Sequence, residues 1–330
     1  MKKVFIKTFG CAQNVADSER IKNYYWEKGY SEIENWKEAD EVVINTCIVR
    51  ESAENRVYGL VDNIRKKYKN NKYIIVTGCL AGISKKIKDV DEIMPIKNIS
   101  YDIAPLRDNS EVALIPISFG CNNFCSYCIV PYARGRETSR SEAEILSEVD
   151  KVIANGYNKV LLIGQNVNSW NKDKFFELLE KVAQKDLEKI SFVSSNPWDF
   201  SNELIEVIAK YKNIDRLIHL PLQSGDDEIL KKMNRRYTSK EYLDLVKKIK
   251  KKVKGVRFST DIIIGFCGED EKAFENTVKV CKKVKYEIAY LNKYSPRRGT
   301  VSAKMYKNDI PQSVKKERWV VLNNLINLGI

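Results

Sequence analysis

Three cysteines in one short run constrain this chain more than any other feature. They are Cys121, Cys125 and Cys128, their spacing is C-x3-C-x2-C, and no fourth cysteine lies close by. A structural zinc ion takes four protein ligands, and a 4Fe-4S cluster has four irons to coordinate. Three thiolates would therefore leave one metal coordination position for another ligand, which indicates a reactive centre.

A zinc knuckle that borrows a distant ligand is the alternative for this run. The chain has one histidine, His219, and it lies within an apolar stretch that predicts a β-strand. We interpret His219 as a packed strand residue rather than a ligand, so a zinc site would lack a ligand of the usual type. The iron-sulfur interpretation is therefore favoured.

The charge balance favours a polyanionic partner without requiring one. Lys and Arg (57) exceed Asp and Glu (44), which gives a formal net charge of +13. Such an excess favours RNA through phosphate contacts and counterion release. Lysines interspersed with acidic residues are, however, more typical of solvated helix faces. Charge alone leaves RNA binding open.

The N-terminus and the distribution of apolar residues indicate a cytosolic protein. The apolar stretch at residues 4–6 is too short for a signal peptide, and no later segment approaches the ~20 apolar residues that span a bilayer. In that reducing compartment, the eight cysteines are poor candidates for disulfides. Metal binding or catalysis is the better interpretation of those that cluster.

Residues 1–110 predict an α/β domain with a parallel sheet, because short β-rich runs alternate with helical ones. Cys11, Cys47 and Cys79 each follow one of the best strand predictions. The carboxyl ends of parallel strands line one crevice, so these thiols could converge there as a second site. Alternatively, each cysteine is a small buried residue that ends a strand in the core. The pattern leaves both possibilities open.

Residues 111–330 predict a second α/β series, which follows a connection near 95–110 that includes Asp108 and Asn109. Strand-like runs alternate with helices, one of them expected over 226–252, and fit an open (βα)6 barrel better than an eight-unit one. The runs are 112–118, 159–163, 190–194, 216–220, 256–264 and 287–294. The 121–128 loop follows the first strand, at the end of a barrel where chemistry takes place.

The C-x3-C-x2-C run, with Tyr127 just before its last cysteine, resembles the signature of the radical S-adenosylmethionine (SAM) enzymes. The resemblance implies that the three thiolates hold a 4Fe-4S cluster, that the amino and carboxylate groups of SAM chelate its free iron, and that Tyr127 lies near the adenine. Further SAM contacts are expected where the second, fourth and fifth barrel strands end. These residues are Gly164, Gln165, Asn166, Gln223, Asp261 and Gly265.

The whole chain resembles the radical-SAM methylthiotransferases. Thr8-Phe9-Gly10-Cys11, Asn45-Thr46-Cys47 and Gly78-Cys79 match the three cysteine motifs of that family's N-terminal domain, which implies a second, auxiliary 4Fe-4S cluster on Cys11, Cys47 and Cys79. Four more motifs are most similar to the branch that modifies isopentenyl-adenosine in tRNA. They are Val49-Arg50-Glu51, Pro131-Tyr132-Ala133-Arg134-Gly135-Arg136-Glu137, Asn196-Pro197-Trp198-Asp199-Phe200 and Met233-Asn234-Arg235-Arg236-Tyr237-Thr238.

The resemblance implies a reaction that uses both clusters. One SAM gives a 5′-deoxyadenosyl radical, which abstracts hydrogen from ring carbon 2 of an adenine in the tRNA anticodon stem-loop. A second SAM methylates sulfur held at the auxiliary cluster, and the methylthio group is joined to the base. An electron donor such as flavodoxin or ferredoxin and a sulfur donor are implied as partners. We expect a cytoplasmic monomer with no membrane association.

The chain departs from the family pattern in three places. The family usually ends in a small RNA-binding β-barrel called TRAM, whereas this chain stops after a helix expected near 312–327. Either the first two domains hold tRNA alone, or this is a shortened version. Cys267 replaces a common proline, and Arg298 interrupts a usual Tyr-Ser-Pro-Arg-Pro-Gly. We interpret Cys267 and Cys281 as non-ligands, because they lack partners at a useful spacing.

Other substrates and another class of function remain as alternatives. Related branches of the family modify threonylcarbamoyl-adenosine in tRNA or an aspartate of a ribosomal protein, and the branches share most motifs. A non-catalytic, metal-stabilised RNA-binding protein is the alternative from another class.

Overall fold

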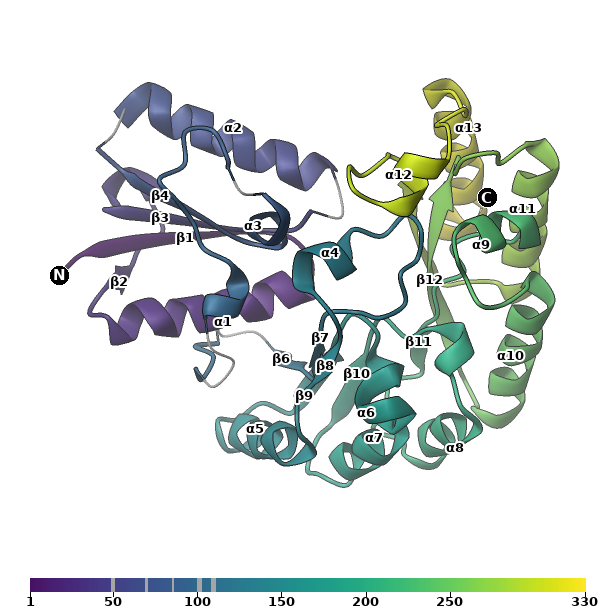
Figure 1. Ribbon diagram of the computed structural model, residues 1–330. Helices are drawn as coiled ribbons and strands as arrows, with labels where there is room; N and C mark the ends of the chain where they lie inside the picture. The colour runs from purple at the N-terminus through teal and green to yellow at the C-terminus, as the bar shows by residue number, and fades with distance from the viewer. Residues whose placement is uncertain (49–50, 69–70, 85, 100–102, 108–110) are drawn as a thin grey trace. The chain divides into compact units, whose positions relative to one another are not determined.

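A computed structural model describes residues 1–48, 51–68, 71–84, 86–99, 103–107 and 111–330 (Figure 1). The predicted connection at Asp108 and Asn109, and the Val49-Arg50 part of one motif, lie outside these residues. The chain divides into two compact units. The first is Met1–Ser110 together with Ile129–Glu137, and the second is Glu111–Cys128 together with Thr138–Ile330.

Among the described residues, the first unit has a five-stranded parallel sheet with the order β2-β1-β3-β4-β5. The strands are β1 (Lys3–Phe9), β2 (Ser31–Glu32), β3 (Glu41–Thr46), β4 (Tyr73–Gly78) and β5 (Glu92–Ile93). The central strands β3 and β4 are nearly continuous runs of buried residues. Such runs are typical of parallel strands that are covered on both faces.

Helices α1 (Ala12–Glu27) and α2 (Glu51–Tyr68) cover opposite faces of this sheet (Figure 1). Ile21 of α1 packs in one apolar cluster with Val43. Val57 of α2 packs in another with Ile44. Successive side chains of a strand point to opposite faces, so β3 contributes to both layers of the core.

The second unit has six parallel strands among its described residues, paired in two sheets of orders β10-β9-β6 and β11-β12-β13. A parallel bridge between Ile190 and Ile214 links the two sheets. The strands are β6 (Ala113–Pro116), β9 (Lys159–Ile163), β10 (Lys189–Phe192), β11 (Leu217–His219), β12 (Arg257–Ile264) and β13 (Ile288–Lys293), and a short antiparallel pair joins β7 (Ser118–Phe119) to β8 (Thr138–Ser139). The predicted α/β class, with an open (βα)6 series, is confirmed.

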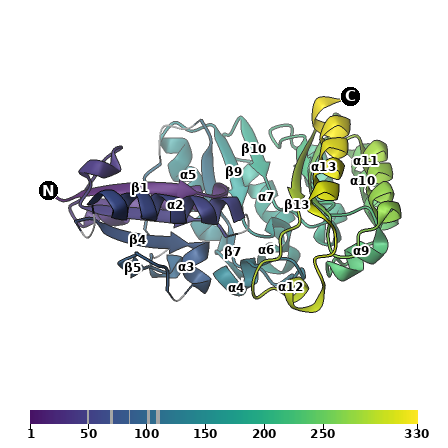
Figure 2. The same ribbon diagram turned by 90° about the horizontal axis from the view of Figure 1, so that it is seen from above.

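Several outer helices of the second unit begin at residues whose side chains cap them. Ser141, Ser201, Thr238 and Asp270 each accept a hydrogen bond from a backbone N–H of the first turn. Helices α10, α11 and α13 lie outside β12 and β13 (Figures 1 and 2). The outer helices are α5 (Glu142–Ala154), α7 (Phe175–Ala183), α8 (Asn202–Lys210), α10 (Ser239–Lys252), α11 (Glu271–Val284) and α13 (Gln312–Asn323).

Short helices complete the fold. They are α3 (Cys79–Ile83) and α4 (Val130–Arg134) in the first unit, and α6 (Trp170–Asp173), α9 (Asp227–Lys232) and α12 (Val301–Met305) in the second. In the described part of the chain, no helix combines the length and the apolar character needed to cross a membrane.

The helix predicted over 226–252 was wrong, because two helices occupy this range. Helix α9 ends at Lys232 and α10 starts at Ser239. Asn234, in the break, has a left-handed backbone with φ of 56°. Thr238 and Glu241 then form a capping box that starts the second helix. Because the helix is interrupted here, residues in 233–237 contact the 121–128 loop.

Candidate functional site

Cys11, Cys47 and Cys79 meet at one edge of the first sheet. Phe9 at the end of β1 pairs with Thr46 at the end of β3, which pairs with Gly78 at the end of β4, so the three strands end level. The Cys47 thiol lies within hydrogen-bonding distance of the sulfurs of both Cys11 and Cys79. The sequence left convergence and separate packing open, and the structure shows convergence.

Cys11, Cys47 and Cys79 form the first triplet, and their environment favours the thiolate form of two of them. The hydrogen bond from Cys47, followed by backbone N–H groups of α1, lowers the pKa of Cys11 to about 6. The same Cys47 thiol and the charge of Arg134 lower the pKa of Cys79 to about 7. The pKa of Cys47 is raised, because it faces both of these sulfurs. Thiolates, not thiols, bind metals.

Arg134 is the residue of the first triplet's surroundings that sequence reasoning missed. Its Nε donates to the Cys79 sulfur at 3.0 Å, and its Nη2 donates to Asp17 Oδ2 at 2.6 Å. The side chain of Arg134 is 3% exposed and that of Asp17 is 1% exposed. The motif that contains Arg134 was noted, but nothing in the sequence indicates that this segment belongs to the first unit.

A buried amide network fixes the backbone beside the first triplet. Asn45 donates from Nδ2 to the Asn14 carbonyl at 2.7 Å and to Ser18 Oγ at 2.8 Å, and it accepts from Asn14 Nδ2 at 3.1 Å. The network ties β3 to the first turns of α1. Gly78 packs against it with φ of 83°, and a Cβ there would lie 2.3 Å from Asn45 Oδ1. Only glycine fits that position.

Cys121, Cys125 and Cys128 form the second triplet, which lies in the loop after β7. Cys121 is buried, whereas Cys125 and Cys128 are partly exposed. Residues from the break between α9 and α10 support this loop. Ser126 donates from its backbone N–H to the Met233 carbonyl at 3.0 Å. Asn234 donates from Nδ2 to the carbonyl oxygen of Phe124 at 3.0 Å.

Arg235, from the same break, gives the second triplet its own buried cation. Its Nη1 donates to the Cys125 sulfur at 3.4 Å, and its Nη2 donates to the Pro221 carbonyl, also at 3.4 Å. The guanidinium lies 4.5 Å from the centre of the Trp198 ring and 5.2 Å from that of Tyr237. Both motifs had been noted without roles, and the structure shows that they pack together.

Tyr127 and the residues that follow β9 are among the expected SAM contacts. Burial raises the pKa of Tyr127, and its ring packs edge-on against Phe266 with centroids 6.5 Å apart. Gly164 approaches Ser118 so closely that a Cβ would lie 2.5 Å from Ser118 Oγ. Among the described residues, neither this buried hydroxyl nor Asn166 Oδ1 has a hydrogen-bond partner. Buried polar atoms without a partner suit a polar ligand.

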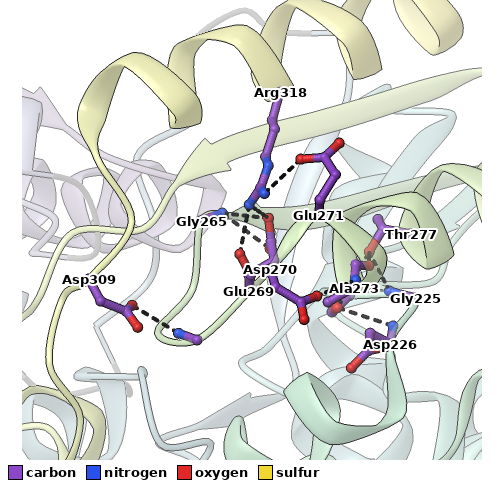
Figure 3. Close-up of polar contacts among 12 residues, drawn as sticks. Gly225, Asp226, Gly265, Glu269, Asp270, Glu271, Ala273, Thr277, Asp309 and Arg318 are labelled. Carbon is purple, nitrogen blue, oxygen red and sulfur yellow. Dashed lines mark hydrogen bonds and ion pairs between the residues drawn. The ribbon is translucent and has the colours of Figure 1, made fainter.

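The remaining predicted SAM contacts lie at the ends of β11 and β12 or within β12, and Gln165 is partly buried after β9. Gln223, with φ of 64°, exchanges backbone hydrogen bonds with β12. Gly265 donates its N–H to both carboxylate oxygens of Glu269, at 3.1 and 3.2 Å. Arg318 of α13 pairs with that carboxylate at 3.0 Å (Figure 3). The Gly265 N–H thus already has a hydrogen-bond acceptor within the protein.

Asp261 lies within β12, and its side chain lines a cavity. His219 lies 3.0 Å from Asp261 Oδ2 through Nε2 and 3.1 Å from Ser259 Oγ through Nδ1. These side chains, with Ser191 and Tyr290, line a cavity of about 320 Å³. His219 is therefore a hydrogen-bonded residue that lines this cavity, as well as a strand residue.

The donor set fits iron-sulfur clusters better than single ions. No group of three His, Cys, Asp or Glu side chains in the described part of the chain is arranged to hold a metal ion as it stands. A 4Fe-4S cluster on Cys11, Cys47 and Cys79 would require these hydrogen-bonded thiols to move apart, because each would bind a different iron. Two all-cysteine triplets, each with a buried arginine beside it, suit a soft, anionic metal centre.

Comparison with solved structures shows the fold. The radical S-adenosylmethionine methyltransferase TsrM from Kitasatospora setae superposes with a TM-score of 0.66 over 92% of this chain and 77% of its own, at 14% identity. The cobalamin-dependent S-adenosylmethionine radical enzyme OxsB gives a TM-score of 0.60 over 100% of this chain and 61% of its own, at 10% identity. At these identities the likeness concerns the fold alone.

Sequence comparison shows the family. Residues 115–281 match the radical SAM superfamily, and residues 3–98 match the uncharacterized protein family UPF0004. A tRNA-2-methylthio-N(6)-dimethylallyladenosine synthase from Clostridium botulinum (strain Okra / Type B1) is 42% identical over 98% of this chain and 81% of its own length. One from Finegoldia magna is 41% identical over 95% and 77%, respectively. The chain therefore belongs to the radical SAM superfamily and, within it, to the family of the tRNA-2-methylthio-N(6)-dimethylallyladenosine synthases.

Proposed function

We propose that the protein adds a methylthio group to ring carbon 2 of isopentenyl-adenosine next to the anticodon of tRNA. The observation that carries the proposal is the convergence of Cys11, Cys47 and Cys79 at the level ends of β1, β3 and β4. A chain with only the Cys121, Cys125 and Cys128 loop could make a radical. The triplet of Cys11, Cys47 and Cys79 provides a place for the sulfur that this reaction inserts.

The two triplets have different roles in the proposed reaction. Cys121, Cys125 and Cys128 would hold one 4Fe-4S cluster, and Cys11, Cys47 and Cys79 would hold the other. When bound, these clusters and S-adenosylmethionine supply the radical, the methyl group and the sulfur, because no protein side chain can activate this ring carbon.

The chain itself supplies position and environment. Arg235 and the residues 233–234 hold the Cys125 loop, while Tyr127 packs beside it with Phe266 as a neighbour for the adenine of SAM. Ser118 Oγ and Asn166 Oδ1 offer buried polar atoms to the amino-acid end of SAM. Gln223 and Asp261 are placed along the adjacent strands. Of the six cysteines, Cys47, Cys79 and Cys121 are buried and so shielded from water.

The proposed partners follow from the proposed chemistry. The anticodon stem-loop of tRNA is the substrate, and the net charge of +13 suits its phosphates. Reduction of the radical-forming cluster requires an electron donor such as flavodoxin or ferredoxin, and each turnover requires a sulfur donor. We propose a monomer that acts in the cytoplasm, where its substrate is found.

Anaerobic reconstitution tests the proposal. The wild-type chain should bind about eight irons, and a variant with Cys11, Cys47 and Cys79 replaced by alanine should bind about four. That variant should still cleave S-adenosylmethionine but leave tRNA unmodified. Cys281→Ala, in a helix far along the chain from either triplet, is the control and should keep both clusters. Wild-type protein that binds zinc without iron would instead favour a non-catalytic RNA-binding protein.

A further inference from the structure

Helix α12 is joined directly to the loop that carries the second triplet. Ser302 of α12 donates its backbone N–H to the Ser126 carbonyl at 2.8 Å. Ser126 stands between Cys125 and Cys128 in the sequence, and both of these cysteines are partly exposed. The Tyr294 hydroxyl donates to Ser302 Oγ at 3.0 Å and anchors the inner side of the helix. The outer face of α12 is therefore separated from this loop by about the width of one helix, on the order of 10 Å.

The outer face of α12 presents two large apolar side chains to solvent. Val301 is 38% exposed and Met305 is 69% exposed, whereas Ser302 is buried. Val301 and Met305 are four residues apart, so they lie on the same face of the helix. Adjacent exposed apolar side chains, when polar residues surround them, mark a surface that binds a partner.

Uncompensated positive charge surrounds this apolar pair. Residues 288–308 contain five basic residues and no acidic one. Three of the basic residues lie on α12 or within three residues of its ends, are exposed, and pair with no carboxylate in the described part of the chain; they are Arg298, Lys304 and Lys307. Asp309, the next acidic residue, accepts a hydrogen bond from the Gly268 N–H at 2.9 Å (Figure 3). The surface around α12 therefore attracts negative charge.

This combination of apolar and basic side chains fits a protein better than RNA. Protein interfaces have an apolar centre, in which methionine is enriched, and a polar rim. RNA-binding surfaces instead stack bases on aromatic rings and arginine planes. The exposed side chains at the centre of this surface, Val301 and Met305, are not aromatic and offer no such plane. The basic rim favours a protein that is acidic.

We propose that the surface around α12 docks an acidic protein that donates single electrons. Its residues are Arg298, Val301, Lys304, Met305 and Lys307. This inference rests on the proposed function, in which a cluster held by the second triplet is reduced before S-adenosylmethionine is cleaved. One electron passes from the donor protein, which is oxidised, to that cluster, which is reduced, and the cleavage consumes it. Small interfaces with charged rims are typical of brief electron-transfer encounters.

The test compares a protein donor with a small-molecule donor. Cleavage of S-adenosylmethionine by the reconstituted chain is measured at rising concentrations of reduced flavodoxin, and each rate is divided by the rate with dithionite, which needs no docking surface. The charge-reversed variant carries Arg298→Glu, Lys304→Glu and Lys307→Glu. Its half-saturating flavodoxin concentration should rise roughly tenfold or more, because charges at the rim of an interface control association.

The matched control changes the net charge by the same amount on and beside α10, which lies away from α12 (Figures 1 and 2). It carries Lys248→Glu, Lys251→Glu and Lys254→Glu, at three exposed lysines. Its half-saturating flavodoxin concentration should equal that of the wild type.

A second variant, Met305→Ser, tests the apolar centre without a change of charge. Its half-saturating flavodoxin concentration should rise roughly fivefold or more, the effect of losing one apolar contact at the centre of an interface. Its affinity for tRNA, measured by gel shift at a fixed salt concentration, should not change, because a neutral side chain makes no ionic contact with phosphate.

The outcomes separate this inference from the alternatives. Equal half-saturating concentrations in the charge-reversed variant and its control would overturn it. Weaker tRNA binding by Met305→Ser with unchanged use of flavodoxin would also overturn it, since the surface would then belong to RNA. If the charge-reversed chain binds no iron, Met305→Ser decides: a higher half-saturating concentration supports the inference, and an unchanged one overturns it. A reconstituted wild-type chain that cleaves no S-adenosylmethionine even with dithionite contradicts the proposed function instead.

Discussion

Arg235 donates a hydrogen bond from Nη1 to the sulfur of Cys125 at 3.4 Å. Arg134 makes the corresponding contact with Cys79 at 3.0 Å. Each arginine is buried, and each comes from a segment far from its cysteine in the sequence. Hydrogen bonds and positive charge at the sulfurs of an iron-sulfur cluster stabilise its more negative, reduced state. The fold thus places a buried cation beside one sulfur of each triplet, an arrangement that would favour the reduced state of a cluster bound there.

Arg235→Gln should make the cluster at Cys121, Cys125 and Cys128 harder to reduce. Loss of the cation removes a contact that favours the reduced cluster, so its reduction potential becomes more negative. An EPR-monitored redox titration of the variant lacking Cys11, Cys47 and Cys79 measures this potential. Arg236→Gln, the exposed neighbour, is the control. Equal potentials in the two variants would exclude this role for Arg235.

Gly78→Ala should disrupt the first triplet while Gly29→Ala does not. Both glycines have positive φ, of 83° and 79°, so both variants have backbone strain of the same kind. At Gly78 the new methyl group would also meet the Thr46 carbonyl oxygen at 2.6 Å, whereas nothing lies within 4 Å at Gly29. Iron analysis should show about four irons for Gly78→Ala and about eight for Gly29→Ala. Full iron content in Gly78→Ala would contradict the proposed location of the auxiliary cluster.

Asn45→Ala should weaken the packing of α1 on the first sheet. The substitution removes the buried Nδ2 that donates to the Asn14 carbonyl and to Ser18 Oγ, and Ser18 Oγ keeps only its hydrogen bond with Thr8 Oγ1. The expected loss is about 1–3 kcal/mol of local unfolding free energy. Hydrogen exchange of the β3 and α1 amides measures it, with Asn63→Ala on the exposed face of α2 as the control. Unchanged exchange would show that the amide network does not stabilise this edge.

Arg318→Met should destabilise the second unit, increasingly so at higher pH. Glu269 would stay buried without its cation, and breaking a buried pair costs about 3–5 kcal/mol. Burial already raises the pKa of Glu269, and Arg318 opposes that rise, so the pKa rises further in the variant. A carboxyl group whose folded pKa exceeds its unfolded value loses stability as the pH rises above the ordinary value of 4.5.

Urea unfolding of Arg318→Met at pH 5 and pH 7 checks this prediction, and Lys316→Met, exposed on the same helix, is its control. The deficit relative to wild type should be larger at pH 7. A deficit that shrinks with rising pH would contradict this explanation of the network drawn in Figure 3.

The parts of the site that local sequence determines were partly predictable. Cys11, Cys47 and Cys79 follow apolar runs, and parallel strands end at one edge, so the pattern allowed convergence beside separate packing, and the structure shows convergence. The class of the second unit followed in the same way from its alternating strands and helices.

The parts that depend on contacts between distant segments were not predictable. Residues 129–137 follow Cys128 directly yet belong to the first unit, and no composition change marks that crossing. The local sequence around Asn234 predicts one long helix. The contacts that stabilise the break come from Phe124 and Ser126, more than a hundred residues earlier, so the local sequence does not show the break. Arg134 and Arg235 reach their cysteines through these two features.

Nucleoside analysis of tRNA tests the central claim most directly. Mass spectrometry of digested tRNA compares cells that lack this gene with the same cells expressing the wild-type chain, and ribosomal peptides are analysed in parallel. We expect isopentenyl-adenosine to accumulate without the gene and its 2-methylthio form to return with it. Unchanged methylthio-isopentenyl-adenosine, with loss of a methylthio group from threonylcarbamoyl-adenosine or from a ribosomal aspartate, would contradict the proposed substrate.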